Sequence, residues 1–308
     1  MQQTPINAAP SGNEPRLDPD VAAYLELLKA NPLPPLHLGT PAEARDRHER
    51  AAASISMPVE AIDHVEDRRC AGVPVRVYRP RNPAGTTIYI HGGGFVTGTT
   101  DSYDRVCRIH ANRSSTTLIA VDYALAPEAK HPVALDEVLA VLRDRTSTAS
   151  HPIVLAGDSA GAYLVALAAL RARDESMRLG ALVMINPVID PALNTPSARS
   201  RATGYRLETE SMRWYWRHYL PEGASPPRLL ESDLTGLPPI LITTAGFDPL
   251  HDEGVAFARR LIAAGVPTQH LDFPGQIHGF LRLGHAIREA TPAHVTIGHF
   301  IRQHAQTA

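Results

Sequence analysis

Residues 153–161 decide the fold, and they read IVLAGDSAG. The stretch begins with an apolar run typical of a buried strand, and residues 160–173 are rich in alanine and leucine, as helices are. Ser159 therefore lies at a sharp turn from strand to helix. Small residues at positions 157 and 161 permit the strained backbone of such a turn, which lifts the serine hydroxyl out of the sheet. The pattern predicts that Ser159 is a nucleophile; a turn that needs its glycines only for shape is the alternative.

On both sides of this turn, short apolar segments alternate with segments of helical periodicity. The predicted strands are 73–78, 86–90, 116–121, 153–156, 181–185, 240–244 and 268–273. The predicted helices are 18–29, 41–53, 104–112, 135–142, 160–173, 208–219, 252–264 and one from about 292. Strands that are apolar throughout and alternate with helices indicate a mostly parallel sheet covered on both faces. The fold class is therefore α/β, doubly wound.

Two parts of the chain do not follow this alternation. Residues 1–55 contain two predicted helices without a strand between them, and residues 190–237 contain no clear strand. We therefore expect an N-terminal helical cap at 1–55 and a catalytic domain at 56–308, with 190–237 inserted as a cap or lid. The helix in this insertion carries Trp214 and Tyr215, which we predict to contact substrate; anchoring of the helix to the body is an equally good interpretation.

A second motif, HGGGF at residues 91–95, directly follows the predicted strand 86–90. Three consecutive glycines cost backbone entropy, so the bare backbone must serve a purpose. Amide groups of this loop, together with the amide of Ala160, can hold the negative oxygen of a tetrahedral intermediate. The nucleotide-binding patterns that also use glycines are missing, which leaves a flexible loop as the alternative. We predict a structural role for His91 and a substrate contact for Phe95.

Together, these two motifs resemble those of the hormone-sensitive-lipase-like family of α/β-hydrolases (bacterial family IV). YALAPE at residues 123–128 is similar to the family segment Y-R-L-A-P-E, and KHP at 130–132 continues it. The resemblance covers about residues 70–283 and the N-terminal helical cap. The chain departs from the family pattern at Ala162, where a glycine is usual, and at Ala124, where an arginine is common. Both positions lie outside the chemistry.

The resemblance implies an α/β-hydrolase fold with a sheet of about eight strands and a helical cap. It also implies that Gly93 and Gly94 are the glycines that donate to the oxyanion, with Ala160 as the third donor. Dimerisation is common in the family, and this is the sole reason to suggest a homodimer.

A serine at such a turn requires an acid later in the chain, and a histidine after the acid. Asp248 follows the predicted strand 240–244 within GFDPL, and the family's acid lies in a similar D-P-L segment. Asp252 is the alternative. It is better suited to the N-cap or first turn of the next helix, so we predict that Asp248 is the acid.

The base must be chosen among 15 histidines. His278 lies in QIHGF, just after the predicted strand 268–273, and the family's catalytic histidine is likewise followed by glycine and phenylalanine. His251 adjoins Asp248 but lies in the wrong order relative to the other motifs, and His285 is predicted on a helix surface. We therefore predict that His278 is the base.

Composition is that of an ordinary soluble enzyme with one core. The 308 residues are 44% hydrophobic and 20% charged, with a formal net charge of -2. This charge does not indicate a face for nucleic acid or anionic lipid. No apolar stretch is long enough for a transmembrane helix, and the first 16 residues do not resemble a secretory signal. The two cysteines, Cys70 and Cys107, are predicted to be free thiols, and the predicted location is the cytoplasm.

These observations predict a serine carboxylesterase that hydrolyses small-molecule esters of short-to-medium acyl chains. A Ser-His-Asp triad needs neither a metal nor an organic cofactor, and no metal-binding pattern is present. The same groups could hydrolyse a lactone, a carbamate or an amide. A non-catalytic receptor on this fold is the alternative of a different class, but receptors similar to this family have lost the catalytic histidine, and His278 is present here.

Overall fold

The computed structural model describes residues 15–54 and 59–306, which contain one sheet of eight strands in the order β1-β2-β4-β3-β5-β6-β7-β8. The strands are β1 (His64–Cys70), β2 (Val73–Arg79), β3 (Thr86–Ile90), β4 (Thr117–Val121), β5 (Ile153–Asp158), β6 (Leu179–Ile185), β7 (Ile240–Phe247) and β8 (Thr268–Ile277). β2 pairs antiparallel with β1 and with β4, and all other neighbours are parallel. The predicted α/β class with a mostly parallel sheet is confirmed.

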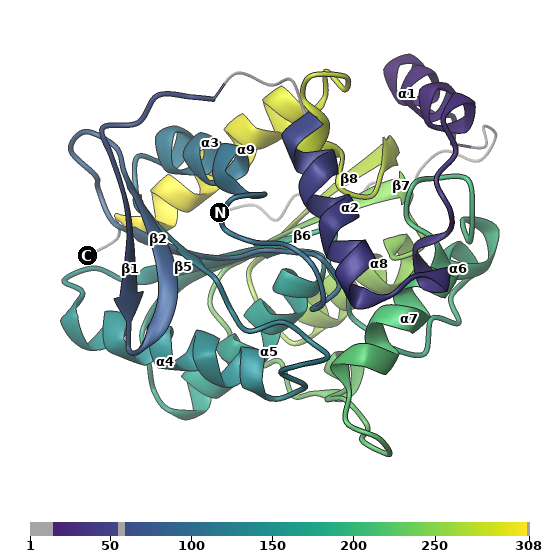
Figure 1. The fold of residues 1–308 in the computed structure, drawn as a ribbon. Helices are drawn as coiled ribbons and strands as arrows, with labels where there is room; N and C mark the ends of the chain where they lie inside the picture. The colour runs from purple at the N-terminus through teal and green to yellow at the C-terminus, as the bar shows by residue number, and fades with distance from the viewer. Residues whose placement is uncertain (1–14, 55–58, 307–308) are drawn as a thin grey trace.

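Helices cover both faces of this sheet (Figure 1). On one face, α3 (Asp104–Ser114) packs against α9 (Ala290–Ala305), and on the other lie α4 (Val133–Thr148), α5 (Ala160–Asp174) and α8 (His251–Ala263). The remaining helices are α1 (Pro19–Ala30), α2 (Pro41–Ser54), α6 (Pro196–Ser200) and α7 (Thr209–Tyr219), and the 3-10 turns are η1 (Leu36–Leu38), η2 (Leu229–Glu231) and η3 (Phe280–Leu283). Within the described ranges, no helix combines the length and apolar composition needed to cross a bilayer.

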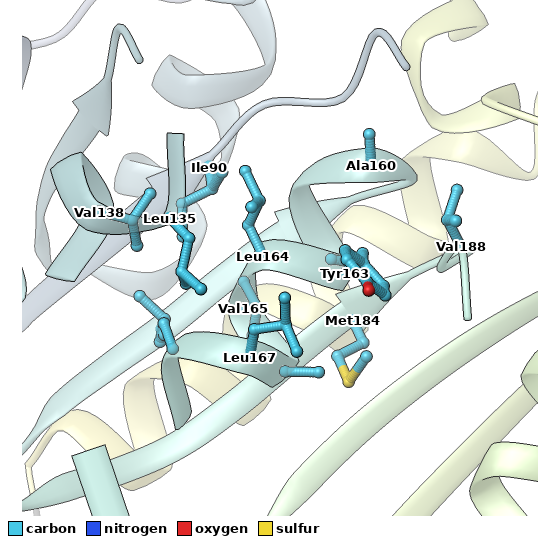
Figure 2. Packing of buried hydrophobic residues seen from close by; sticks show 14 of the residues in the cluster. Ile90, Leu135, Val138, Ala160, Tyr163, Leu164, Val165, Leu167, Met184 and Val188 are labelled. Carbon is cyan, nitrogen blue, oxygen red and sulfur yellow. The ribbon is translucent and has the colours of Figure 1, made fainter. Parts of the chain in front are cut away.

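Helix α5 is the central packing element, because its apolar side chains contact both the sheet and α4. Figure 2 shows Tyr163, Leu164 and Leu167 of α5 among Ile90 of β3, Met184 of β6 and residues of α4. All three α5 side chains are buried. Truncation of a fully buried leucine such as Leu164 to alanine typically costs about 2–5 kcal/mol, so this packing holds the start of α5 firmly.

β1 has no counterpart among the predicted strands, and several other elements extend beyond their predicted bounds. β1 reads HVEDRRC and is mostly exposed, so it lacks the apolar alternation that predicts a strand. It is a strand because each of its residues pairs with one of β2. His285 lies in an exposed turn after η3 and not on a helix, which corrects the prediction. Both cysteines, Cys70 and Cys107, are free thiols, as predicted, and the structure shows that both are buried.

The carboxyl ends of β3, β5, β7 and β8 meet at one edge of the sheet, because these strands are parallel. The motifs at 91–95, 157–161, 246–250 and 276–280 all lie at these ends. The predicted cap segments contact the same region. Arg45 of α2 donates from Nε to the Val96 carbonyl at 2.9 Å, and η1 packs against α7. The division into a cap and a catalytic domain stays a prediction, and residues 1–14 and 55–58 lie outside the described part.

Candidate active site

Ser159 occupies the predicted turn between β5 and α5 in a strained backbone conformation. Its φ of 52° and ψ of -120° are unusual for a residue other than glycine. The turn requires small neighbours: a Cβ at Gly157 would lie 2.7 Å from the Ile90 carbonyl oxygen, and a Cβ at Gly161 only 2.1 Å from it. The close approach of β3 to the first turn of α5 therefore explains both glycines, and it places the Ser159 hydroxyl at the carboxyl edge of the sheet.

The three residues predicted to form a triad come together in one chain of hydrogen bonds. Nε2 of His278 lies 3.1 Å from Oγ of Ser159, and its Nδ1 lies 2.6 Å from Oδ2 of Asp248. Asp248 is 1% exposed, and its other oxygen accepts the Leu250 amide at 2.9 Å. Since the carboxylate can only accept, Nδ1 carries the proton and Nε2 is free to accept from the serine hydroxyl.

The two alternatives weighed from the sequence for acid and base lie together elsewhere. His251, the first residue of α8, has Nδ1 2.9 Å from Asp252 Oδ1 and Nε2 3.2 Å from Asp272 Oδ1. Asp252 lies in the first turn of α8, as predicted, and its Oδ2 accepts the Ser197 amide of α6. Burial by itself would lower the pKa of His251, but the hydrogen bonds with Asp272 and Asp252 outweigh it and raise this pKa to about 9.

His251 is therefore expected to stabilise the fold in a pH-dependent way. Its pKa is about 9 in the folded protein and about 6.5 in an unfolded chain. A raised pKa contributes stability that is complete below the unfolded value and is lost as the pH rises through the folded value. We expect His251→Gln to lower the free energy of unfolding by about 1 kcal/mol near neutral pH and by much less near pH 10.

Urea unfolding of wild type and His251→Gln at both pH values measures this difference. His285→Gln is the control, because His285 is exposed in a turn. An equal gap between wild type and His251→Gln at both pH values would contradict the prediction.

The glycine loop after β3 has the backbone conformation expected of an anion-binding loop. Gly93 and Gly94 have φ values of 119° and 61°, which other residues rarely adopt. In the described part of the chain, the amides of these two glycines have no acceptor, whereas the Gly92 amide already donates to Asp158 Oδ1 at 2.9 Å. This leaves Gly93 and Gly94 available for a substrate oxygen. The third predicted donor, Ala160, is the first residue of α5, where amides lack helical partners.

Gly93→Ala is expected to lower kcat for an ester substrate by about 10²–10³-fold, the usual cost of losing one oxyanion donor. A Cβ at Gly93 would lie 2.1 Å from the Thr97 carbonyl oxygen, so the loop would have to shift. Steady-state kinetics with p-nitrophenyl acetate measures the effect. Gly223→Ala is the matched control, because Gly223 also has a positive φ but faces open space. A kcat for Gly93→Ala equal to that of the control would contradict the prediction.

Asp158, the residue before the nucleophile, is a positioning residue that is absent from the predicted site. Its Oδ1 accepts from the Tyr89 hydroxyl and the Gly92 amide, both at 2.9 Å, and its Oδ2 accepts from the Tyr103 hydroxyl at 2.8 Å. It thus connects the serine turn to the glycine loop. The one signal in the sequence was its place inside the GDSAG motif. His91 has the predicted structural place, stacked on Tyr123 at 4.3 Å between ring centroids.

Two further residues join the predicted cap segments to the site, and no motif in the sequence indicates either of them. From the 190–237 insertion, Nη1 of Arg206 donates to the carbonyl oxygen of His278 at 3.0 Å. From α2, His48 lies 3.2 Å from the Thr97 hydroxyl and 3.3 Å from Nη1 of Arg282. Burial lowers the pKa of His48 well below its usual value, and the Arg282 charge lowers it further, so the ring is neutral.

The three aromatic residues predicted to contact substrate are buried around the glycine loop. Phe95 stacks on Tyr219 of α7 at 3.8 Å between ring centroids, which anchors α7 to the body. The Tyr215 ring packs directly on Gly94, since a Cβ there would lie 2.2 Å from it. Trp214 packs edge-on against Tyr215. It stays a prediction that Phe95, Trp214 and Tyr215 contact the substrate.

No group of three or more His, Cys, Asp or Glu side chains is arranged to hold a metal ion within residues 15–54 and 59–306.

The model of one protein family, described as the alpha/beta hydrolase fold, matches residues 87–282 of this chain. The matched range includes the glycine loop, the serine turn, Asp248 and His278. This chain belongs to that family. The hormone-sensitive-lipase-like resemblance predicted from the sequence is confirmed. Similar curated proteins of the family are esterases. An ethyl acetate hydrolase of Pseudomonas putida is 36% identical over 94% of this chain and 99% of its own length. An arylesterase of Saccharolobus solfataricus is 34% identical over 71% of this chain and 76% of its own.

Solved α/β-hydrolase structures agree with the sequence comparisons. A thermostable esterase from Pseudomonas putida superposes with a TM-score of 0.88 at 29% identity, covering 96% of this chain and 100% of the other. A hyperthermophilic esterase from Pyrobaculum calidifontis gives a TM-score of 0.88 at 32% identity, covering 95% and 100%. The predicted activity is confirmed: this α/β-hydrolase is a serine carboxylesterase, and its substrates are small-molecule esters.

Proposed function

We propose that Ser159 is the nucleophile, His278 the general base and Asp248 the acid of this esterase. The observation that carries the proposal is the continuous chain of hydrogen bonds from Asp248 through His278 to Ser159. His278 takes the hydroxyl proton at Nε2 while Oγ attacks the ester carbonyl carbon. Asp248 holds the ring in the tautomer that leaves Nε2 unprotonated, and it stabilises the imidazolium that forms.

The amides of Gly93, Gly94 and Ala160 hold the oxygen of the tetrahedral intermediate in this proposal. Each such donor lowers the barrier by about 3 kcal/mol, because it is already oriented before the charge develops. His278 then returns its proton to the leaving alcohol, and the acyl group stays on Ser159. Attack by water on this acyl-enzyme releases the carboxylic acid and restores the serine.

Esters with short acyl chains are the proposed substrates, and two observations support this. The Tyr215 ring packs against Gly94, so a bulky side chain borders the proposed oxyanion site. Similar proteins also include an ethyl acetate hydrolase and an acetyl esterase. We further propose that α1, α2 and residues 190–237 form the cap that borders the acyl site, through contacts such as those of His48 and Arg206.

Turnover of p-nitrophenyl acetate, butyrate, octanoate and palmitate tests the substrate class. We expect kcat/KM for acetate or butyrate to exceed that for octanoate by about tenfold or more, because a longer chain must displace packed cap residues. An organophosphonate that traps active serines should label one peptide, the one that contains Ser159. A kcat/KM that rises from butyrate to palmitate would contradict the short-chain proposal, and labelling at another serine would contradict the assignment of Ser159.

A further inference from the structure

A small cavity of about 20 Å³ lies against the reacting side chains Ser159 and His278. The rest of its wall comes from β3, β5, β6, α3 and the segment that follows His278, and includes His110 and Asn186. Its volume suits an ordered water molecule, which needs about 10–15 Å³. Sites for small-molecule ligands are at least ten times larger, at about 300 Å³ or more. The cavity is therefore the right size for water and too small for an acyl chain.

Two buried polar side chains that line this cavity have no hydrogen-bond partner among the described residues. Asn186 is 3% exposed, and neither its Nδ2 nor its Oδ1 has a partner. His110 is 1% exposed, and both of its ring nitrogens lack partners. Buried polar groups in folded proteins are nearly always satisfied by protein or by ordered water. These atoms therefore indicate a polar ligand in the cavity.

One ring nitrogen of His110 can bond to such a ligand, as a donor or as an acceptor depending on the tautomer. Burial lowers the pKa of this histidine well below its usual value, and the neighbouring His294 and Arg113 lower it further, so the ring is neutral. A neutral imidazole has one N–H group and one bare nitrogen. The ring is held in place by packing on Tyr89 at 5.6 Å and on His294 at 5.0 Å between ring centroids.

Asn186 is held just as firmly beside the nucleophile. It directly follows Ile185, whose carbonyl accepts the Ser159 amide at 2.8 Å, and its own amide donates to the Thr243 carbonyl at 3.0 Å. Its φ of 43° is one that asparagine tolerates better than most residues. Glycine would tolerate this backbone equally well, so the conformation alone does not explain a side chain with four hydrogen-bonding sites at this place.

We propose that Asn186 and His110 bind a water molecule in this cavity and that this water hydrolyses the acyl-enzyme, an inference that rests on the proposed role of Ser159. The water oxygen bonds to the acyl carbon while His278 Nε2 takes one of its protons. The bond from that carbon to Oγ then breaks, the proton passes from His278 to Oγ, and the carboxylic acid leaves. Asn186 and His110 are positioning residues in this step, since they orient the water and do not touch the acyl group.

Kinetics of Asn186→Leu tests the proposal, because leucine fills similar space without polar atoms. We expect kcat for p-nitrophenyl acetate to fall by about tenfold and acetyl-enzyme to accumulate at Ser159, as seen by mass spectrometry after acid quench. The rate of phosphonylation of Ser159 should change by less than about twofold, since that reaction needs no water. His110→Phe, which keeps the ring packing, should behave in the same way.

Two controls separate water binding from a structural effect. Asn186→Gly keeps the left-handed backbone and leaves room for water, so its kcat should lie well above that of Asn186→Leu. His294→Phe alters a buried histidine that packs on His110 without lining the cavity, so it should not accumulate acetyl-enzyme. A crystal structure of the wild type should show a water within hydrogen-bonding distance of both Asn186 and His110.

The proposal is overturned if the crystal structure shows no water there. It is also overturned if phosphonylation and turnover fall in parallel in Asn186→Leu, or if neither changes. Failure of the wild type to be phosphonylated at Ser159 is a different result, and it would overturn the proposed triad.

Discussion

Ser159→Ala is expected to lower kcat for p-nitrophenyl acetate by about 10⁶-fold, because the variant lacks the oxygen that forms the acyl-enzyme. The His278 base would remain, but it would have no hydroxyl to activate. The variant is still expected to hydrolyse the ester about 10³–10⁴-fold faster than water alone does, because the oxyanion donors and the substrate-binding contacts remain. Steady-state kinetics with carefully purified variant measures both quantities.

Ser114→Ala is the matched control for the nucleophile. Ser114 is fully buried in α3, and its hydroxyl donates to the His110 carbonyl at 2.7 Å. Loss of this hydrogen bond should cost about 1 kcal/mol of stability and leave kcat nearly unchanged. If Ser159→Ala retained turnover similar to that of Ser114→Ala, the assignment of the nucleophile would be wrong.

Asp248→Asn is expected to lower kcat by about 10⁴-fold with little change in the fold. The amide keeps the shape of the carboxylate, but its NH₂ group can donate to Nδ1 of His278, which favours the tautomer with the proton on Nε2. That tautomer cannot accept the proton of Ser159. The loss of negative charge also removes the stabilisation of the imidazolium. Measurement of kcat together with the circular dichroism spectrum separates this effect from unfolding.

Asp252→Asn tests the alternative candidate for the acid. Asp252 binds His251 and the Ser197 amide, and neither contact belongs to the proposed triad. Its replacement should lower stability slightly and keep kcat close to that of wild type. A loss of activity in Asp252→Asn as large as that in Asp248→Asn would show that the acid was assigned wrongly.

The fold could be predicted largely from the sequence, because the buried strands are apolar throughout and leave little ambiguity. β3 was predicted with its observed bounds, and the start of α5 was placed at Ala160 because the turn before it has a distinctive pattern. β1 was missed, since a charged, exposed strand at the edge of a sheet is defined by its pairing partner and not by its own periodicity. α4 extends to Thr148, whereas the prediction ended it at residue 142. The last turns face solvent, so they lack the apolar stripe on which the prediction was based.

The residues assigned to the chemistry were found because each lies in a short motif at the end of a strand. Ser159, Asp248 and His278 have a required order along the chain, and parallel strands bring their carboxyl ends to one edge. The number of histidines made the base ambiguous. The structure places Nε2 of His278 beside Ser159, and it turns His251 toward Asp272.

Interactions over a few residues set the apolar strands, most of the helices, the strained serine turn and the bare glycine loop, so these features can be read along the chain. Packing between distant segments set the rest. Asp158 receives hydrogen bonds from Tyr89 and Tyr103, and Arg206 reaches the carbonyl of His278, across separations for which no short motif exists. The same holds for the cavity at Asn186 and His110, because a void and its unpartnered walls arise only when the sheet, α3 and the segment after β8 are brought together.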